Sequence, residues 1–181
     1  GGRVFASHFH YYCLQSSPAP WPTTATWNHT TNPPQTQWPV LIDQSFPKGV
    51  AFAQWMLNVG GSTTLGTFPI DQARNDVDAV NGQPPSDPVS VRWVYANSPN
   101  LVEYYSFNTP VGLTSDQQCG KVVFSDLHVG AGNQPGGTFP SQTCTQSPTL
   151  TPQEKALEFL LFDLSSCIQN DTTPPPPPPV R

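Results

Sequence analysis

Two short stretches of this sequence carry side chains whose types and spacing could do chemistry. In ASHFH, Ser7, His8 and His10 follow the apolar run RVFA. In SDLH, Asp126 and His128 follow the apolar run KVVF. If the two apolar runs form neighbouring parallel strands, all five side chains lie at the carboxyl edge of the sheet, where open α/β sheets bind their ligands.

A nucleophilic hydrolase is one arrangement that these residues allow. Ser7 would be the nucleophile, His128 the general base and Asp126 the acid that orients the imidazole. His8 lies next to the serine and could take part as well. The stretch ASHFH lacks the G-x-S-x-G elbow that presents such a serine in many hydrolases, which argues against this arrangement.

A metal site is the second arrangement. His8 and His10 share one face if the backbone is extended there, and His128 could supply a third imidazole. If a helix begins at His8 instead, the first two imidazoles diverge and the site does not form. The simplest alternative is structural, with histidines that hydrogen-bond locally and stiffen a loop. No cofactor is expected, although a divalent metal is compatible with three imidazoles.

Aromatic side chains early in the sequence could form a carbohydrate-stacking surface. The candidates are Trp21, Trp27, Trp38, Tyr11 and Tyr12, which lie in or near a stretch rich in proline and threonine. Their flat faces suit a pyranose ring, and the abundant asparagine, glutamine and threonine suit its hydroxyls. Ordinary packing is the favoured explanation for each tryptophan.

The composition favours a protein that is secreted or exposed at the cell surface. Only 10% of the 181 residues are charged, so neutral polar groups provide the solubility. The net charge of −5 offers no basic surface for nucleic acid. No apolar run reaches the roughly 18 residues that cross a bilayer, so membrane insertion is not expected. The chain begins with glycine, and we expect it to be a mature or excised piece of a longer protein.

The cysteine count predicts disulfides. Four cysteines without a C-x-x-C pair favour two bridges over a zinc site. Three pairings are open. We favour Cys119 with Cys144, because this bridge closes a glycine-rich loop that has few core residues, and Cys13 with Cys167 then follows. Four free thiols are the alternative.

Local patterns predict a sheet with flanking helices and long irregular loops. A helix is expected near residues 45–59, with Ser45 as its cap and Phe46, Val50, Ala53 and Leu57 on one face. The runs VSVRWVYA and LVEYYSF alternate like strands around the turn NSPN, which predicts a hairpin. KVVFSD reads as a strand buried on both faces.

The segment from residue 72 to residue 88 is expected to be a polar loop. Asp71, Asp76 and Asp78 lie in or beside it, but their spacing does not fit a calcium-binding EF-hand loop. We therefore expect solvated carboxylates here and no calcium site.

The end of the sequence predicts one further helix and a stiff tail. Thr151 and Glu154 form a capping box around Pro152. The apolar stripe expected on this helix is Leu157, Leu160, Leu161, Leu164 and Ile168. Six consecutive prolines then favour polyproline II. The sequence thus predicts a single domain over residues 1–169 and a proline-rich linker over residues 170–181.

Three stretches, GGRVFASH, CGKVVFSDLH and PQEKALEFLLFDL, resemble the trehalose-utilisation (ThuA-like) family of the class I glutamine amidotransferase-like fold. They are also similar to a group of secreted bacterial proteins. The resemblance implies a flavodoxin-like α/β sheet in which GGRVFASH lies near the middle, so the N-terminal part of the fold would be incomplete here. The cysteine nucleophile and the His-Pro-Glu motif of the glutaminases are missing, so glutamine hydrolysis is not expected.

These observations together predict a secreted or surface-exposed bacterial binding or structural module that interacts with carbohydrate. They leave open whether the protein is an enzyme. One alternative, implied by the resemblance, is a carbohydrate-active enzyme of ThuA-like type that uses His8, His128 and Asp126. The other alternative is a subunit of an extracellular assembly, whose partners would be other chains of the same assembly.

Overall fold

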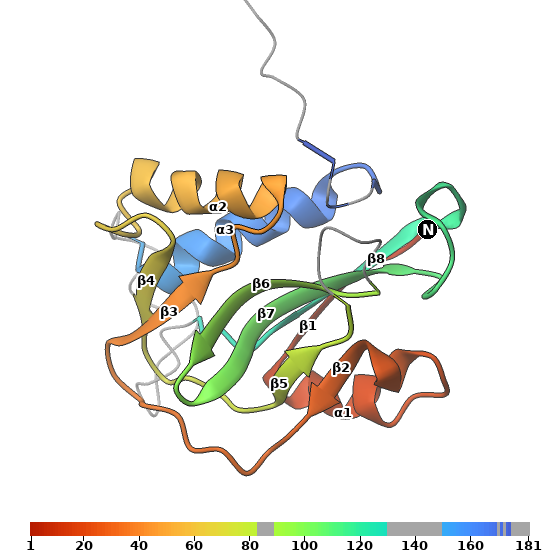
Figure 1. Cartoon of the computed structure of the whole chain (residues 1–181), viewed down its shortest axis with the longest axis horizontal. Helices are drawn as coiled ribbons and strands as arrows, with labels where there is room; N and C mark the ends of the chain where they lie inside the picture. The colour runs from red at the N-terminus through yellow and green to blue at the C-terminus, as the bar shows by residue number, and fades with distance from the viewer. Residues whose placement is uncertain (83–88, 130–149, 170, 172, 175–181) are drawn as a thin grey trace, which may run out of the picture.

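A curled six-stranded sheet forms the middle layer of the structure (Figure 1). The computed structural model describes residues 1–82, 89–129, 150–169, 171 and 173–174. The strand order across the sheet is β1 (Arg3–Ser7), β8 (Gly120–Ser125), β7 (Asn100–Thr109), β6 (Val91–Asn97), β3 (Trp38–Ile42) and β4 (Thr67–Ile70). β1 and β8 are parallel, and the other neighbouring pairs are antiparallel.

The α/β class predicted from the sequence is therefore confirmed. A flavodoxin-like sheet is parallel, and among the described strands only β1 and β8 run parallel, so the finer fold assignment stays a prediction. The hairpin of β6 and β7 is confirmed, as is the strand β8, which is buried along its whole length. β8 is buried because helices cover one face of the sheet and a second layer of short elements covers the other.

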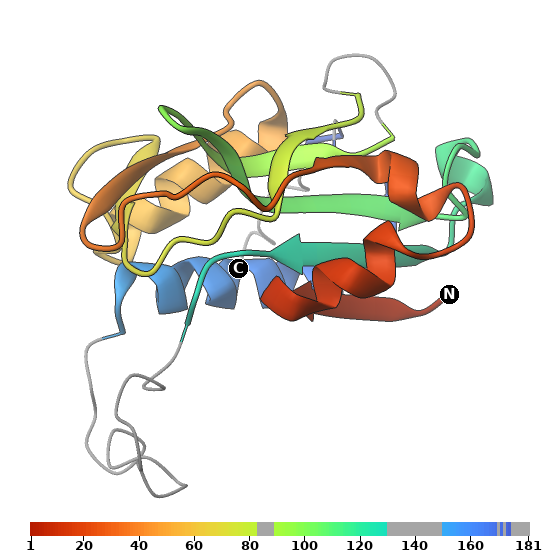
Figure 2. The ribbon, with the colours of Figure 1, turned by 90° about the horizontal axis from the view of Figure 1, so that it is seen from below.

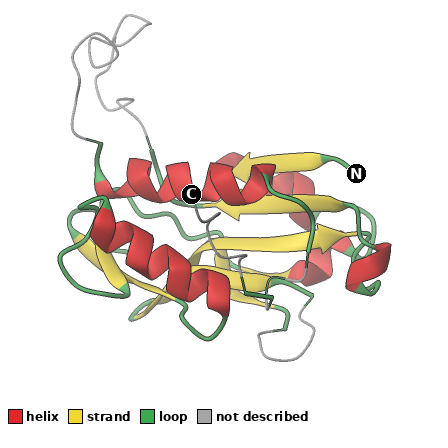
Figure 3. Ribbon diagram, turned by 90° about the horizontal axis from the view of Figure 1, so that it is seen from above, coloured by secondary structure: helices red, strands yellow, loops and turns green. Residues whose placement is uncertain are grey.

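Helices α2 (Pro47–Asn58) and α3 (Pro152–Ser165) lie side by side against one face of the sheet (Figures 1 and 3). α2 begins at Pro47 with Phe46 in the N-cap position, one residue later than expected. Its buried face is formed by Gly49, Phe52, Ala53 and Met56. Val50 is exposed instead, because the buried stripe is rotated toward α3 and the sheet.

Helix α3 begins with the capping box expected from the sequence. The backbone amide of Glu154 donates to Thr151 Oγ1 at 3.2 Å, and the amide of Thr151 donates to the Glu154 carboxylate at 2.7 Å. Leu160 and Leu164 are buried as predicted, whereas Leu161 is exposed. Ile168 lies beyond the last turn and does not extend the stripe.

A second, smaller layer packs on the opposite face of the sheet (Figure 2). It consists of the two-stranded sheet of β2 (Ala25–Trp27) and β5 (Val77–Val80), helix α1 (Tyr11–Gln15) and the short 3-10 turns η1 (His8–His10) and η2 (Trp21–Thr24). A further 3-10 turn, η3 (Ser115–Gln117), precedes β8. The expectation of a polar loop from residue 72 onward was wrong at β5, because pairing with β2 and packing on β7 make a strand of this segment.

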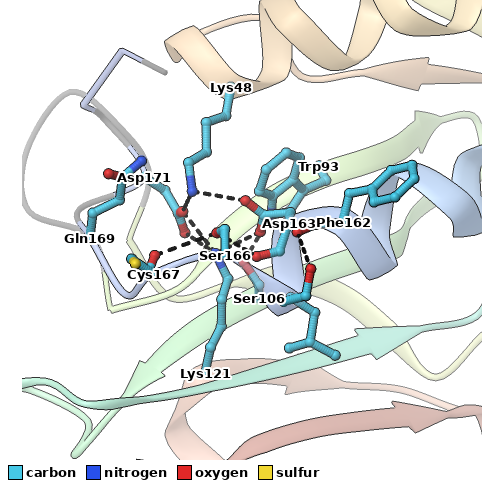
Figure 4. A network of polar contacts seen from close by, with 12 residues as sticks. Lys48, Trp93, Ser106, Lys121, Phe162, Asp163, Ser166, Cys167, Gln169 and Asp171 are labelled. Carbon is cyan, nitrogen blue, oxygen red and sulfur yellow. Dashed lines mark hydrogen bonds and ion pairs between the residues drawn. The ribbon is translucent and has the colours of Figure 1, made fainter. Parts of the chain in front are cut away.

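A buried network of ion pairs joins α2, β8, α3 and the segment after α3 (Figure 4). Lys48 Nζ lies 2.8 Å from carboxylate oxygens of Asp163 and Asp171, and Lys121 Nζ lies 2.8 Å from oxygens of the same two residues. Asp171 is buried, so the packed part of the chain includes this residue, which the sequence assigned to the linker. The prolines from residue 175 onward lie outside the described residues.

The cysteine thiols of Cys13 and Cys167 are exposed and unpaired in the structure. Cys13 lies in α1 and Cys167 follows α3, on opposite faces of the sheet, so the expected bridge between them is not formed. The other expected bridge, Cys119 with Cys144, involves a residue outside the described part of the chain. No helix among the described residues is long and apolar enough to cross a membrane.

Candidate functional site

The parallel pairing of β1 with β8 brings two functional side chains together. Ser7 and Ser125 are paired as the last residues of the two strands. His8 and Asp126 follow them directly, so both lie at the carboxyl edge of this strand pair. This edge is where the sequence predicted the site if the two strands were parallel neighbours.

His8 adopts a backbone conformation that is uncommon for a residue with a side chain. Its φ is +38°, at the abrupt change from strand β1 to the turn η1. Such conformations cost about 1–3 kcal/mol and persist where the surrounding structure holds them. Here the imidazole is held by Asp76, whose Oδ2 lies 3.2 Å from His8 Nδ1.

The Asp76 carboxylate is the centre of the site. Its second oxygen lies 3.0 Å from Nδ1 of His29, so one carboxylate bridges two imidazoles. The backbone amide of Asp76 donates to Oδ2 of Asp126 at 3.1 Å. Asp76 itself is placed by the strand β5 that follows it and by its carbonyl, which accepts a hydrogen bond from the amide of Asn28.

Three carboxyl groups of this region are withdrawn from water. Asp76, Asp126 and Glu103 are all buried, and the amide of Asp126 donates to the carbonyl of Glu103 at 2.8 Å. Burial, followed by the negative charges of Asp76 and Glu103, raises the pKa of Asp126 well above its usual range. Burial also raises the pKa of Glu103, against the opposing effect of the amide and charge of Arg74.

Oδ1 of Asp126 is shielded from water and has no hydrogen-bond partner among the described residues. A buried carboxylate oxygen without a partner destabilises the folded state, because it loses its hydrogen bonds to water and makes none to the protein. One imidazole nitrogen of His8 and one carboxylate oxygen each of Asp76 and Asp126 lie within 4.8 Å of one another. The three residues therefore form a compact group of ligand atoms.

His128 lies near this group. Burial lowers the pKa of the His128 imidazole, and the charges of Arg74 and His8 lower it further. Its carbonyl accepts a hydrogen bond from the side-chain amide of Gln153, which ties the segment after β8 to helix α3. Of the four residues proposed for catalysis, the structure brings His8 and Asp126 together, and His128 lies two residues after Asp126.

Ser7 and His10 do not join the group. Nδ1 of His10 lies 2.7 Å from the carbonyl of Ser7, so this exposed imidazole turns back on its own backbone. A 3-10 turn begins at His8 and separates its imidazole from that of His10. Under this condition the three-histidine metal site was not expected to form. No hydrogen bond joins the Ser7 hydroxyl to an imidazole in the described part of the chain.

Aromatic rings surround the two histidines. Phe9 packs against His8 and Tyr11 packs against His29, each pair tilted and with ring centroids 4.1 Å apart. Phe9 and Tyr12 are strongly exposed. The tryptophans proposed for carbohydrate lie elsewhere. Trp21 and Trp27 pack on the sheet through Phe107, Tyr105 and Phe124, and Trp38 is buried on the other face, so the three do not share one surface.

Sequence reasoning missed Asp76, His29 and Glu103. Asp76 was assigned to a solvated loop, and the signal that could have corrected this is the run VDAV after it, which has strand-forming residues. Glu103 lies within the strand LVEYYSF, where a single acid between apolar neighbours indicates a buried carboxyl group. His29 carries no local signal, because its role depends on contact with a residue far along the chain.

Comparisons with protein-family models, curated proteins and solved structures found no match for this chain. The resemblance to the ThuA-like family therefore stays a prediction. The site itself consists of two imidazoles on one buried carboxylate and a second carboxylate beside it, and the histidines are accessible to solvent.

Proposed function

We propose that this protein is a carbohydrate-active hydrolase that works outside the cell, with His8 and Asp76 at the centre of its active site. The observation that carries the proposal is the Asp76 carboxylate, which is buried between the imidazoles of His8 and His29. An imidazole held by a carboxylate through one ring nitrogen keeps its other nitrogen for proton transfer. His8 is better suited to proton transfer than His29, because Nε2 of His29 already lies 3.3 Å from Oε1 of Gln15.

The position of the site supports contact with a substrate. The side chain of His8 is 30% exposed and that of His29 is 35% exposed, whereas Asp76 is only 4% exposed. The substrate would therefore meet the imidazoles, and the carboxylate would act behind them by orienting the rings. His128 lies at the same edge and would provide a second proton-transfer group.

Three features support carbohydrate as the substrate class. Exposed aromatic rings, those of Phe9 and Tyr12, lie close to the histidines in the chain and could stack on sugar rings. The chain is rich in neutral polar residues and poor in charge, as expected of a protein outside the cell. The resemblance to the ThuA-like family, which favours a flavodoxin-like fold and sugar chemistry, points the same way.

Glycoside hydrolysis adds water across the bond between the anomeric carbon and the departing oxygen. In the proposed reaction, the attacking water gives its hydroxyl to the anomeric carbon and its proton to His8. The departing oxygen takes up a proton from the site or from solvent. Ser7 has no role in this scheme, since its hydroxyl has no imidazole partner among the described residues.

The experiment is a hydrolysis screen with matched histidine variants. The purified chain is incubated with p-nitrophenyl glycosides and with oligosaccharides, and the release of nitrophenol or reducing sugar is measured. His8→Gln and Asp76→Asn should abolish the activity, and His10→Gln should keep it, because His10 bonds only to its own turn.

Two outcomes would contradict the hydrolase. One is an activity that survives His8→Gln. The other is an absence of hydrolysis across the whole panel. Sugar binding without hydrolysis, followed by tryptophan fluorescence, would instead favour the binding module that the sequence predicts. Detection of the chain in the medium of its source cells tests the location.

A further inference from the structure

We propose that His8, Asp76 and Asp126 bind a divalent first-row metal ion, of which Zn²⁺ and Mn²⁺ are the representatives to test. The inference concerns a different set of ligands from the three histidines suggested by the sequence. It rests on the proposed function only for the role of the ion in activating water, and the binding itself stands on the geometry.

The three ligand atoms lie close together, and the pair from His8 and Asp76 has the spacing of a coordination shell. Ligand atoms of the three residues lie within 4.8 Å of one another, and His8 Nδ1 is 3.2 Å from Asp76 Oδ2. Nitrogen and oxygen ligands lie about 2.0–2.2 Å from Zn²⁺, so two ligands of one ion are about 3–4 Å apart. The ion would lie between the imidazole of His8 and the two carboxylates.

Charge favours a cation at this place. Asp126 has an oxygen that is buried and without a hydrogen-bond partner in the described part of the chain. Asp76 and Glu103 add two more buried carboxyl groups, and backbone hydrogen bonds link both residues to Asp126. The charge of the Arg74 guanidinium acts on Glu103. A divalent ion would supply the missing partner for Asp126 and offset the repulsion between the carboxylates.

The donors also indicate which kind of ion fits. Ca²⁺ and Mg²⁺ prefer shells made of oxygen alone, whereas an imidazole combined with carboxylates suits Zn²⁺, Mn²⁺ and similar ions. The ion can enter past His8 and His29, whose side chains are about a third exposed.

His29 would support the site from outside the metal shell. Its Nδ1 lies 3.0 Å from Oδ1 of Asp76, which leaves Oδ2 to face His8 and the ion. Such a hydrogen bond fixes the orientation of a ligating carboxylate. With the ion bound, His8 acts as a ligand, and the ion takes over the activation of water.

Direct titration tests the inference without any substrate. The whole chain, without a histidine tag and after treatment with a chelator, is titrated with Zn²⁺ and with Mn²⁺ by calorimetry. We expect one ion per chain. His8→Gln and Asp126→Asn should each weaken binding by about tenfold or more, and His10→Gln should leave it unchanged.

Two controls keep the result interpretable. The exposed thiols of Cys13 and Cys167 could bind Zn²⁺ on their own, and Mn²⁺ avoids this because it prefers oxygen and nitrogen to thiolate. Circular dichroism tests whether each variant folds. If Asp126→Asn does not fold, His8→Gln carries the test, since His8 lies partly at the surface and its replacement removes one ligand.

The inference is overturned if neither ion binds, or if binding persists in His8→Gln and Asp126→Asn. It fails separately from the proposed function. Metal binding without hydrolysis of any glycoside would refute the hydrolase and keep the metal site. Hydrolysis that needs His8 but is unchanged by chelator would refute the role of the ion in activating water and keep the hydrolase, and the titration alone decides the binding.

Discussion

Oδ2 of Asp126 accepts a hydrogen bond from the backbone amide of Asp76 at 3.1 Å, which joins the end of β8 to the residue before β5. This bond links the central sheet to the smaller layer at the point where both carboxylates meet His8. With His29, the site is thus assembled from four separate segments of the chain, and its geometry depends on how the two layers pack.

The first prediction concerns the buried ion pairs on the other side of the sheet. Lys121→Met should lower the free energy of unfolding by about 3–5 kcal/mol, because Asp163 and Asp171 stay buried while losing one of their two lysines. Urea denaturation measures the change. Lys155→Met is the control, since Lys155 donates to a carbonyl at the surface, and it should cost less than about 1 kcal/mol. Equal losses in the two variants would contradict the prediction.

The second prediction is a loss of stability in acid that depends on Asp163. Burial alone would raise its pKa, but the charges of Lys121 and Lys48 outweigh this and hold the pKa below 3.8. A carboxyl group whose pKa is lowered by folding stabilises the protein above its unfolded pKa, and that contribution disappears as pH falls through the folded pKa.

Urea denaturation from about pH 7 to about pH 2 tests this, and Asp163→Asn should show a smaller acid-dependent loss than the wild-type chain. Asp116→Asn, at an exposed position, should behave like the wild type. An unchanged acid response in Asp163→Asn would refute the assignment.

Lys48 gives the opposite dependence at high pH, where stability falls as pH rises. Burial would lower the pKa of Lys48, but the charges of Asp171 and Asp163 outweigh this and raise its pKa above 10.5. The contribution of Lys48 to stability is therefore lost only as pH rises beyond that value.

The third prediction concerns the central tryptophan. Trp93 is fully buried, and its indole N–H donates to Ser106 Oγ at 2.8 Å. Ser106→Ala removes the acceptor and leaves a buried donor unpaired, which should cost about 1–3 kcal/mol of stability. Thermal unfolding followed by tryptophan fluorescence measures the loss. Ser165→Ala, at an exposed position on α3, should change the midpoint little, and a loss as large as that of Ser106→Ala would argue against this explanation.

The fourth prediction concerns the thiols of Cys13 and Cys167. Because both are exposed and unpaired, each should react with a maleimide in the folded protein without reductant. Cys13→Ser and Cys167→Ser should each remove one label, counted by mass spectrometry. Failure of both thiols to react would support the bridge that the sequence predicts and contradict the structure at this point.

Some elements could be predicted from the sequence because their causes are local. The capping box of Thr151 and Glu154 involves residues three apart, and the hairpin of β6 and β7 follows from two alternating runs around a short turn. The parallel pairing of β1 and β8 was a condition for the site, and the structure meets that condition. The buried faces of the helices were harder to predict, because Val50 and Leu161 have apolar side chains but are exposed in the fold.

The sequence by itself determined helices α2 and α3, the hairpin of β6 and β7, the strand β8, and that His8 and Asp126 follow apolar, strand-forming runs. It did so because propensity, capping and alternation act between near neighbours in the chain. Only the tertiary structure decided that Asp76 and His29 complete the site and that Ser7 and His10 stay outside it. Those positions depend on contacts between segments far apart in the chain and on the backbone turn at His8, whose positive φ is maintained by the surrounding fold.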